Sequence, residues 1–204
     1  MTSKKSKIFH LVADQVPPRA KIRYNHGMTI PKEIEAKYAL GDAEALRERL
    51  VAATAVRVGA VDQVDVFYDD GSGRYCEGGC GLRIRRTRPA GDPAAEEVRI
   101  TFKGPLEQAG GLKVRDELET TLGDGVTADG ILAALGFAPV VTVTKHRESW
   151  QLGGCQIEID VVESAGQFVE VEGPTAESVR AVCDTLALCG EPITTSYAAM
   201  VAGN

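Results

Sequence analysis

The sequence lacks any long apolar run, and this absence bounds where the protein works. No stretch of its 204 residues approaches the roughly 18 consecutive apolar residues that a membrane-spanning helix needs. The N-terminus carries lysines, but no apolar segment with a small-residue cleavage site follows them. We therefore expect a soluble, cytoplasmic protein without a membrane partner.

Paired cysteines and the common nucleotide-binding motifs are also missing. The five cysteines are scattered without a CxxC pair, which fits a reducing compartment and provides no zinc or redox motif. The three histidines form neither an HExxH metal motif nor a serine triad. No GxxxxGK[ST] loop is present and no GxGxxG follows a strand, so nucleotide binding of those two classes is unsupported.

Positive charge is in short supply as well. Lysine and arginine number 23 against 29 aspartates and glutamates, which gives a formal net charge of −6. General nucleic-acid binding needs a clustered basic excess that displaces counterions from phosphates. We therefore expect no general nucleic-acid partner, although a local basic pocket remains compatible with this charge.

The length of the chain is enough for one sizeable core and short for two. Residues 1–29 lack periodicity and contain Pro17 and Pro18, so we expect a loosely ordered leader there. Residues 30–204 are expected to form a single domain.

Helix signals in this domain are few. Asp42 is a candidate N-cap for an amphipathic segment, Thr127 is the expected cap of a second helix that ends at Gly136, and a third helix has a Thr-x-x-Ser start. Helices are therefore expected over 41–55, 127–137, 175–190 and 195–203.

Strand-like segments separated by turn residues dominate the rest of the domain. The turns carry glycine-rich stretches such as GSGRYCEGG and LEQAGG. Besides EIEAK near the start, strands are expected over 61–70, 81–89, 96–105, 113–122, 140–150, 154–162 and 166–173.

An ordinary strand at the surface of a core has one apolar face and one solvated face of mixed polar residues. In these strands the second face carries charged residues of both signs. In EIEAK, Glu33, Glu35 and Lys37 stand on one face and Ile34 and Ala36 on the other, because side chains alternate with period two. For a single strand, a solvated face explains such alternation. The pattern nevertheless recurs in nearly every strand, at Arg83 and Arg85, Arg99 and Lys103, Arg115 and Glu117, Lys145 and Arg147, Glu158 and Asp160, and Glu170 and Glu172.

Repetition of charged pairs of both signs favours a closed arrangement. Closing about eight antiparallel strands into a barrel turns all these faces into one lumen, with the apolar faces outward beneath the helices. A buried charge without a close partner is costly, so such a lumen is expected to bind something. The predicted fold class is α+β, a closed antiparallel eight-stranded β-barrel tunnel with a charged lumen and flanking helices.

The two kinds of charge in this lumen point to one kind of ligand. Arginine and lysine clusters suit a polyanion, because guanidinium groups make paired hydrogen bonds to phosphate oxygens. Carboxylate clusters suit hard divalent cations, which are commonly shared with substrate phosphates. Together they predict a complex of a divalent metal with a triphosphate, and metal-assisted phosphoryl chemistry.

Eight short motifs, in order, carry a family resemblance: EIEAK, QVDVFYDD, LRIRR, ITFKGP, RDELET, GFAPVVTVTKHRESW, IEIDVVESAGQFVEVEG and SYAAM. EIEAK is similar to the ExExK signature of the CYTH family, also called triphosphate tunnel metalloenzymes. That family includes class IV adenylyl cyclases, thiamine triphosphatases and inorganic triphosphatases. The resemblance covers about residues 32–201, and the family's antiparallel eight-stranded barrel tunnel agrees with the alternation argument.

The resemblance implies a role at each matching position. Catalysis is expected at Glu33, Glu35, Lys37 and Glu172. The cofactor is expected to be Mg²⁺ or Mn²⁺, held by Glu33, Glu35, Asp160, Glu170 and Glu172. The substrate phosphates are expected to bind Lys37, Arg83, Arg85, Lys103, Arg115, Lys145 and Arg147.

Some lumen and neighbouring residues have a structural alternative. For Arg115 and Glu117, a purely structural salt bridge is as well supported as a role in the site. His146 falls on the opposite face from Lys145 and Arg147, so an outward, partly solvated histidine is expected. Ser196 and Tyr197 lie in the family's C-terminal motif, where we expect packing of a helix against the barrel.

Three functions remain open for this site. The first expectation is a class IV adenylyl cyclase-like enzyme that converts ATP to cyclic AMP and pyrophosphate. The alternative is a triphosphatase that hydrolyses inorganic triphosphate, thiamine triphosphate or a nucleoside triphosphate. A lesser alternative is a non-catalytic triphosphate-binding sensor. The sequence selects neither attack at the α- over the γ-phosphorus nor a monomer over a homodimer.

Overall fold

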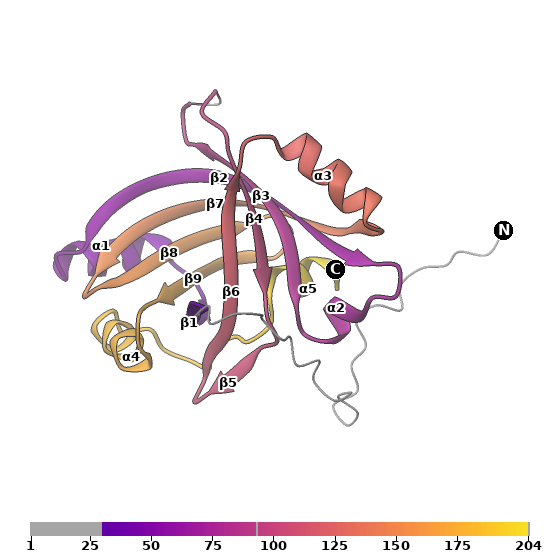
Figure 1. Cartoon of the computed structure of the whole chain (residues 1–204). Helices are drawn as coiled ribbons and strands as arrows, with labels where there is room; N and C mark the ends of the chain where they lie inside the picture. Colours follow the sequence, from indigo (N-terminus) through magenta and orange to yellow (C-terminus); the bar gives the residue numbers. More distant parts are fainter. Residues whose placement is uncertain (1–29, 93, 204) are drawn as a thin grey trace.

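A single antiparallel sheet closes on itself to form the body of the protein (Figure 1). The structure, a computed structural model, describes residues 30–92 and 94–203. Strand β1 pairs with both β9 and β6, so the ring is complete and the expected closed eight-stranded barrel is confirmed. Around the ring lie β1 (Lys32–Ala39), β9 (Gly166–Glu172), β8 (Cys155–Val162), β7 (Phe137–Leu152), β2 (Val56–Asp70), β3 (Gly81–Pro89), β4 (Glu97–Lys103) and β6 (Leu112–Leu122).

Helices cover the outside of this barrel, with α4 and α3 on opposite sides (Figure 1). The main core lies between α1, α4 and the outer faces of β1, β8 and β9, where Ala36, Ile157 and Val171 are buried. A second cluster of apolar side chains lies under α3, around Ile84 and Leu132. The helices are α1 (Ala43–Ala52), α2 (Arg74–Glu77), α3 (Gly125–Ala134), α4 (Ala176–Thr185) and α5 (Tyr197–Ala202).

The helix starts follow from side chains that satisfy free backbone N–H groups. Asp42 caps α1, and Thr175 forms a capping box with Ser178 at the start of α4, as the sequence predicts. The predicted cap of α3 is wrong. Asp124 accepts the N–H groups of residues 126 and 127, so the helix begins two residues earlier than expected and ends before Gly136, which has a positive φ.

Two segments predicted as turns contain regular structure. The glycine-rich tip between β2 and β3 includes the short helix α2, whose first turn is held by Asp69 accepting hydrogen bonds from two backbone N–H groups there. The segment after β4 contains a short strand, β5 (Glu107–Ala109), which extends the sheet beside β6. Both were missed because glycine and polar residues dominate these stretches of sequence.

The residues at 1–29, which the sequence indicates to be a leader, lie outside the described part of the chain. Among the described residues, no helix is both long and apolar enough to cross a bilayer. The five cysteines are all free thiols.

The core beneath α1 offers a direct test of the fold. Leu50 is fully buried, so Leu50→Ala should lower the free energy of unfolding by about 2–5 kcal/mol through lost burial and a cavity. Its neighbour Val51 is 64% exposed, so Val51→Ala should change stability by less than about 0.5 kcal/mol. Urea unfolding of both variants measures the difference, and equal costs would contradict this packing of α1.

Candidate active site

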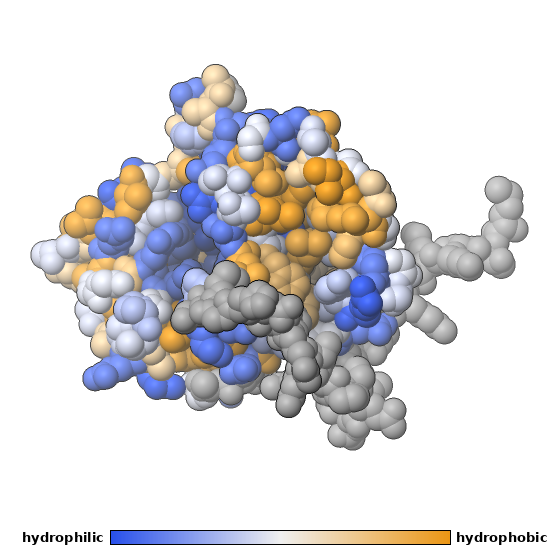
Figure 2. Space-filling model, viewed as in Figure 1, coloured by the Kyte–Doolittle hydropathy of each residue, from blue (hydrophilic) through white to orange (hydrophobic). Residues whose placement is uncertain are grey.

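The inward faces of the strands carry the charged residues of the sequence motifs. Glu33, Glu35 and Lys37 are buried on β1, while Ala36 between them packs in the outer core. Figure 2 shows a recess lined by hydrophilic side chains in the body of the barrel. The structure places all the candidate site residues on this inward face, on β1, β3, β4, β6, β7, β8 and β9.

The carboxylate of Glu33 is held by cations from two other strands. Lys103 Nζ donates to Glu33 Oε1 at 2.6 Å, and Arg115 Nε donates to Glu33 Oε2 at 2.7 Å. Burial alone would raise the pKa of Glu33, but these two cations outweigh it and hold the pKa well below its usual range. Arg115 is therefore a lumen residue that forms a salt bridge with Glu33, while Lys103 also donates to Glu117.

Glu172 has the opposite electrostatic environment. It is the register partner of Glu35 across β1 and β9, and no ion pair among the described residues involves it. Although its side chain reaches solvent, desolvation and the negative charges of Glu33 and Glu35 raise the pKa of Glu172 to about 7. Glu172 therefore lacks the paired cations that its neighbours Glu33 and Glu35 have.

Across the lumen, β2 and β3 form a cationic wall around one carboxylate. Arg85 binds Asp65 through two hydrogen bonds, Nε to Oδ1 and Nη2 to Oδ2, both at 2.6 Å. Arg83 has looser contacts, at 3.3 Å to Asp65 and 3.4 Å to Thr101. Burial and the charge of Arg85 lower the pKa of Arg83. Arg83 is thus the guanidinium of this wall with free bonding capacity.

A third set of charges lies on β7, β8 and β9. Arg147 donates to Asp160 at 2.7 and 2.5 Å and to Glu170 at 2.7 Å. Lys145 Nζ lies 3.2 Å from Asp160, and Lys37 Nζ lies 3.3 Å from Glu170. Burial, followed by the charge of Arg147, lowers the pKa of Lys145 to about 7. The two lysines are therefore the less tightly bound cations of this set.

Sequence reasoning missed two buried lumen residues. Asp65 lies in QVDVFYDD, where its alternation with Val64 and Val66 was a usable signal. Lys113 stands two positions before Arg115 on β6 and forms an ion pair with Glu35. Finding that pair requires the register between β1 and β6, which no single strand contains.

The residues present fit a divalent metal by chemistry. Within residues 30–92 and 94–203, no three Asp, Glu, His or Cys side chains are gathered in a metal-binding geometry. Carboxylate oxygens are, however, the ligands that Mg²⁺ and Mn²⁺ prefer. The raised pKa of Glu172 beside Glu33 and Glu35 marks a place where an added positive charge would be stabilising. Occupancy would require Glu33 and Glu35 to exchange their lysine and arginine partners.

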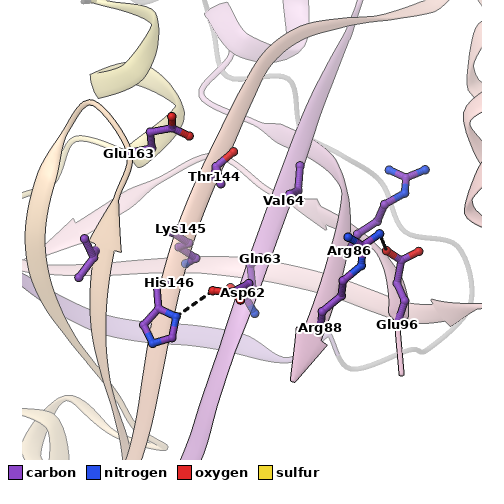
Figure 3. Close-up of a pocket in the computed structure, with 11 residues that line it drawn as sticks. Asp62, Gln63, Val64, Arg86, Arg88, Glu96, Thr144, Lys145, His146 and Glu163 are labelled. Atoms are coloured by element: carbon purple, nitrogen blue, oxygen red, sulfur yellow. Dashed lines mark hydrogen bonds and ion pairs between the residues drawn. The ribbon is translucent and has the colours of Figure 1, made fainter. Parts of the chain in front are cut away.

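The residues that alternate with the inward-facing ones along each strand face outward. His146 is one of them, as expected. Its Nδ1 lies 2.8 Å from Asp62 Oδ1, and the two line a groove of about 520 Å³ on the outer face of β2, β3, β7 and β8 (Figure 3). Lys145 also borders this groove, but its side chain is buried on the lumen side. The groove is therefore separate from the charged lumen.

The C-terminal helix lies at one end of the lumen. Tyr197 packs against Val143, Val162 and Phe168, which occupy the same strand faces as the charged residues. The expected packing of this motif against the barrel is thus observed, and Ser196 caps α5. The charged lining gives way to an apolar layer at this end.

The lumen of this closed antiparallel barrel thus has acidic and basic groups opposed across it. The chain belongs to the CYTH domain family, whose model matches residues 31–181. It is 27% identical over 141 residues to a protein of Methanocaldococcus jannaschii named "Putative adenylate cyclase", covering 69% of this chain and 75% of that one.

Solved structures share the fold. The PH1819 protein of Pyrococcus horikoshii has a TM-score of 0.70 and 26% identity, over 81% of this chain and 95% of that one. A Hippeastrum protein described as a "putative adenylyl cyclase" that reveals a dominant triphosphatase activity has a TM-score of 0.62 and 19% identity, over 81% of this chain and 92% of that one. At 19% identity the second likeness shows the fold alone.

The unequal contacts of Arg83 and Arg85 give a paired prediction. Arg83→Lys should weaken tripolyphosphate binding about tenfold or more, because the planar fork is lost, while the melting temperature hardly changes. Arg85→Lys should lower the melting temperature, because buried Asp65 loses a paired hydrogen bond. Calorimetric titration and thermal unfolding of both variants measure this, and a destabilised Arg83→Lys protein with unchanged affinity would remove Arg83 from the site.

The raised pKa of Glu172 predicts a pH dependence of stability. A carboxyl whose folded-state pKa lies above its unfolded value stabilises the fold at low pH and loses that contribution as pH rises through about 7. Without metal, Glu172→Gln should therefore reduce the fall in melting temperature between pH 5.5 and pH 8. The difference between variant and parent isolates this group, and parallel pH curves would show that Glu172 keeps an ordinary pKa.

Proposed function

We propose that this protein is a divalent-metal-dependent enzyme that acts on a triphosphate, and that its reaction is the conversion of ATP to cyclic AMP and pyrophosphate. The observation that carries this proposal is the imperfect pairing of the lumen cations. Arg83, Lys37 and Lys145 have only contacts of 3.2 Å or more to their partners, so they retain bonding capacity for phosphate oxygens. The name of the archaeal relative supports the choice of cyclisation.

The candidate site residues of the lumen form two sets, one for the phosphates and one for the metal. The phosphate-binding set would be Lys37, Arg83, Lys103, Arg115, Lys145 and Arg147, with Arg85 fixed by Asp65 beside it. The metal-binding set would be Glu33, Glu35, Asp160, Glu170 and Glu172. A bound Mg²⁺ or Mn²⁺ would supply Lewis-acid stabilisation of charge on the phosphate oxygens.

In the proposed reaction the ribose 3′-oxygen forms a bond to the α-phosphorus as the bond to pyrophosphate breaks. The cationic wall stabilises the negative charge that accumulates on the departing pyrophosphate. The 3′-hydroxyl must lose its proton to solvent, and the Lewis acidity that a metal held by Glu33, Glu35 and Glu172 would supply favours this loss.

Hydrolysis of the triphosphate is the second candidate, and one observation favours it. Tyr68 and Trp150 are buried on the outer face of the barrel, and Phe67, Phe168 and Tyr197 pack together at the end of the lumen. Among the described residues, the polar part of the lumen therefore presents no aromatic ring for stacking on adenine. The dominant triphosphatase activity stated for the Hippeastrum protein agrees with this alternative.

Product identification separates the candidates. The purified protein is incubated with Mn²⁺ or Mg²⁺ and, in parallel, ATP, tripolyphosphate or thiamine triphosphate. Cyclic AMP and pyrophosphate from ATP are the expected products. Release of ADP and phosphate alone, with comparable turnover of tripolyphosphate, would replace cyclisation by hydrolysis. Binding without turnover of any substrate would leave a triphosphate sensor.

Two neighbouring residues on β7 provide a matched pair for this assay. Lys145→Gln should reduce turnover by at least about tenfold, because it removes a charge-assisted contact to phosphate. His146→Gln alters a side chain on the outer face and should leave turnover within about twofold. Equal losses in both variants would indicate general damage to β7, and an active Lys145→Gln protein would contradict the proposed phosphate site.

A further inference from the structure

The C-terminal segment converges on one lumen lysine. The backbone N–H of Ile193 donates to the carbonyl of Lys37 at 2.7 Å, and Lys37 Nζ donates to the carbonyl of Thr195 at 3.2 Å. The next turn of chain begins α5 with Tyr197, whose ring lies under the same ammonium group. Lys37 is therefore held from three directions by a segment far from it in sequence.

Tyr197 brings two ammonium groups onto one aromatic ring. Lys37 Nζ lies 3.8 Å from the ring centroid and Lys145 Nζ lies 5.0 Å from it. A cation within about 6 Å of a ring centroid is attracted by the ring, and more strongly when it is desolvated. Both lysine side chains are only 1% exposed, so this attraction is at its most effective here.

The ring itself is fixed in place. Phe168 packs against it with centroids 5.2 Å apart, and Val143 and Val162 complete the contact. These residues are apolar and give the ring a single position at the end of the charged lumen. The two lysines come from β1 and β7, which are not neighbours in the sheet, so the ring is the common surface that sets their separation.

The hydroxyl of Tyr197 makes no hydrogen bond of ordinary geometry within the described residues. Tyr197 is 8% exposed, and its hydroxyl faces the carboxylate of Asp160 without making such a bond to it. A buried polar group without a partner is unfavourable, and native proteins rarely leave one unless a ligand or water completes it. Among the described residues, a second buried tyrosine, Tyr68 on the outer face, donates its hydroxyl to Asp129 at 2.5 Å.

These contacts point to one role, which rests on the proposed function. We propose that Tyr197 is a phosphate-binding residue of the tunnel: its hydroxyl donates a hydrogen bond to an oxygen of a bound oligophosphate, while its ring holds Lys37 and Lys145 against the same phosphate group. The ligand class is an inorganic or nucleoside triphosphate. The step is binding only, so no bond is made or broken.

The hydroxyl and the ring are tested by two substitutions. Tyr197→Phe removes the hydroxyl and should weaken tripolyphosphate binding about tenfold without lowering the melting temperature of the free protein. Tyr197→Leu also removes the ring and should weaken binding further. Tyr68→Phe, the matched control, should lower the melting temperature and leave the affinity unchanged, because Tyr68 lies outside the lumen. Calorimetric titration with tripolyphosphate is the measurement.

A second readout does not depend on any ligand. In protein labelled with ¹³C-lysine, the ε-methylene protons of Lys37 should resonate upfield, because the adjoining Nζ lies 3.8 Å from the centroid of the Tyr197 ring. The signal is assigned by its loss in Lys37→Arg. The shift should persist in Tyr197→Phe and vanish in Tyr197→Leu. This measurement tests the placement of the lysines even if the parent protein binds no triphosphate. A parent protein that binds no triphosphate would refute the proposed function and the phosphate contact together.

Three results would overturn the proposal separately from the proposed function. Parent-like affinity in Tyr197→Phe would eliminate the hydroxyl contact. Parent-like affinity in a folded Tyr197→Leu protein would eliminate the holding of the lysines. A lowered melting temperature with intact affinity in both variants would reduce Tyr197 to a packing residue.

Discussion

Mutual neutralisation of charges inside a closed barrel is the constraint on which the structure depends. Alternation in each strand sends every second side chain inward, and ring closure through β1 and β6 gives those side chains no route to bulk solvent except the ends. Each inward cation therefore needs an acid opposite or beside it, as Arg85 has Asp65 and Arg115 has Glu33. The apolar core is displaced to the outside, under α1, α3 and α4.

This arrangement makes the ligand a competitor for ion pairs that already exist. A phosphate oxygen that binds Arg83 or Lys145 replaces a loose contact, whereas one that binds Arg85 must first displace the paired hydrogen bonds to Asp65. Weakly charged molecules gain too little to replace such contacts. A highly charged anion, accompanied by a cation for the released carboxylates, matches both walls at once.

Much of this design is visible in the sequence because the alternation is local. EIEAK and LRIRR each reveal an inward charged face without knowledge of any partner strand. What the sequence does not reveal is non-local. The ion pair between Glu35 and Lys113 needs the register of β1 against β6, and the crowding that raises the pKa of Glu172 needs the register of β1 against β9. The start of α3 was misjudged for a simpler reason, since Asp124 and Thr127 are both good caps and only the path of the chain selects one.

The pairing of β1 with both β6 and β9 has a consequence for synthesis of the chain. Glu33 and Arg115 are 82 residues apart, and Lys37 and Thr195 are 158 apart, so β1 can pair with β6 only once more than half of the sequence has been made, and with β9 and the C-terminal segment only late in synthesis. Contacts of such long range carry a high loop-closure entropy and slow the search for the native state. Until the last strand arrives, β1 has an unpaired edge, and its alternating glutamates and lysine give that edge the charge that discourages pairing with other chains. The residues that line the lumen in the finished barrel thus also place charge on β1 before its partner strands are available.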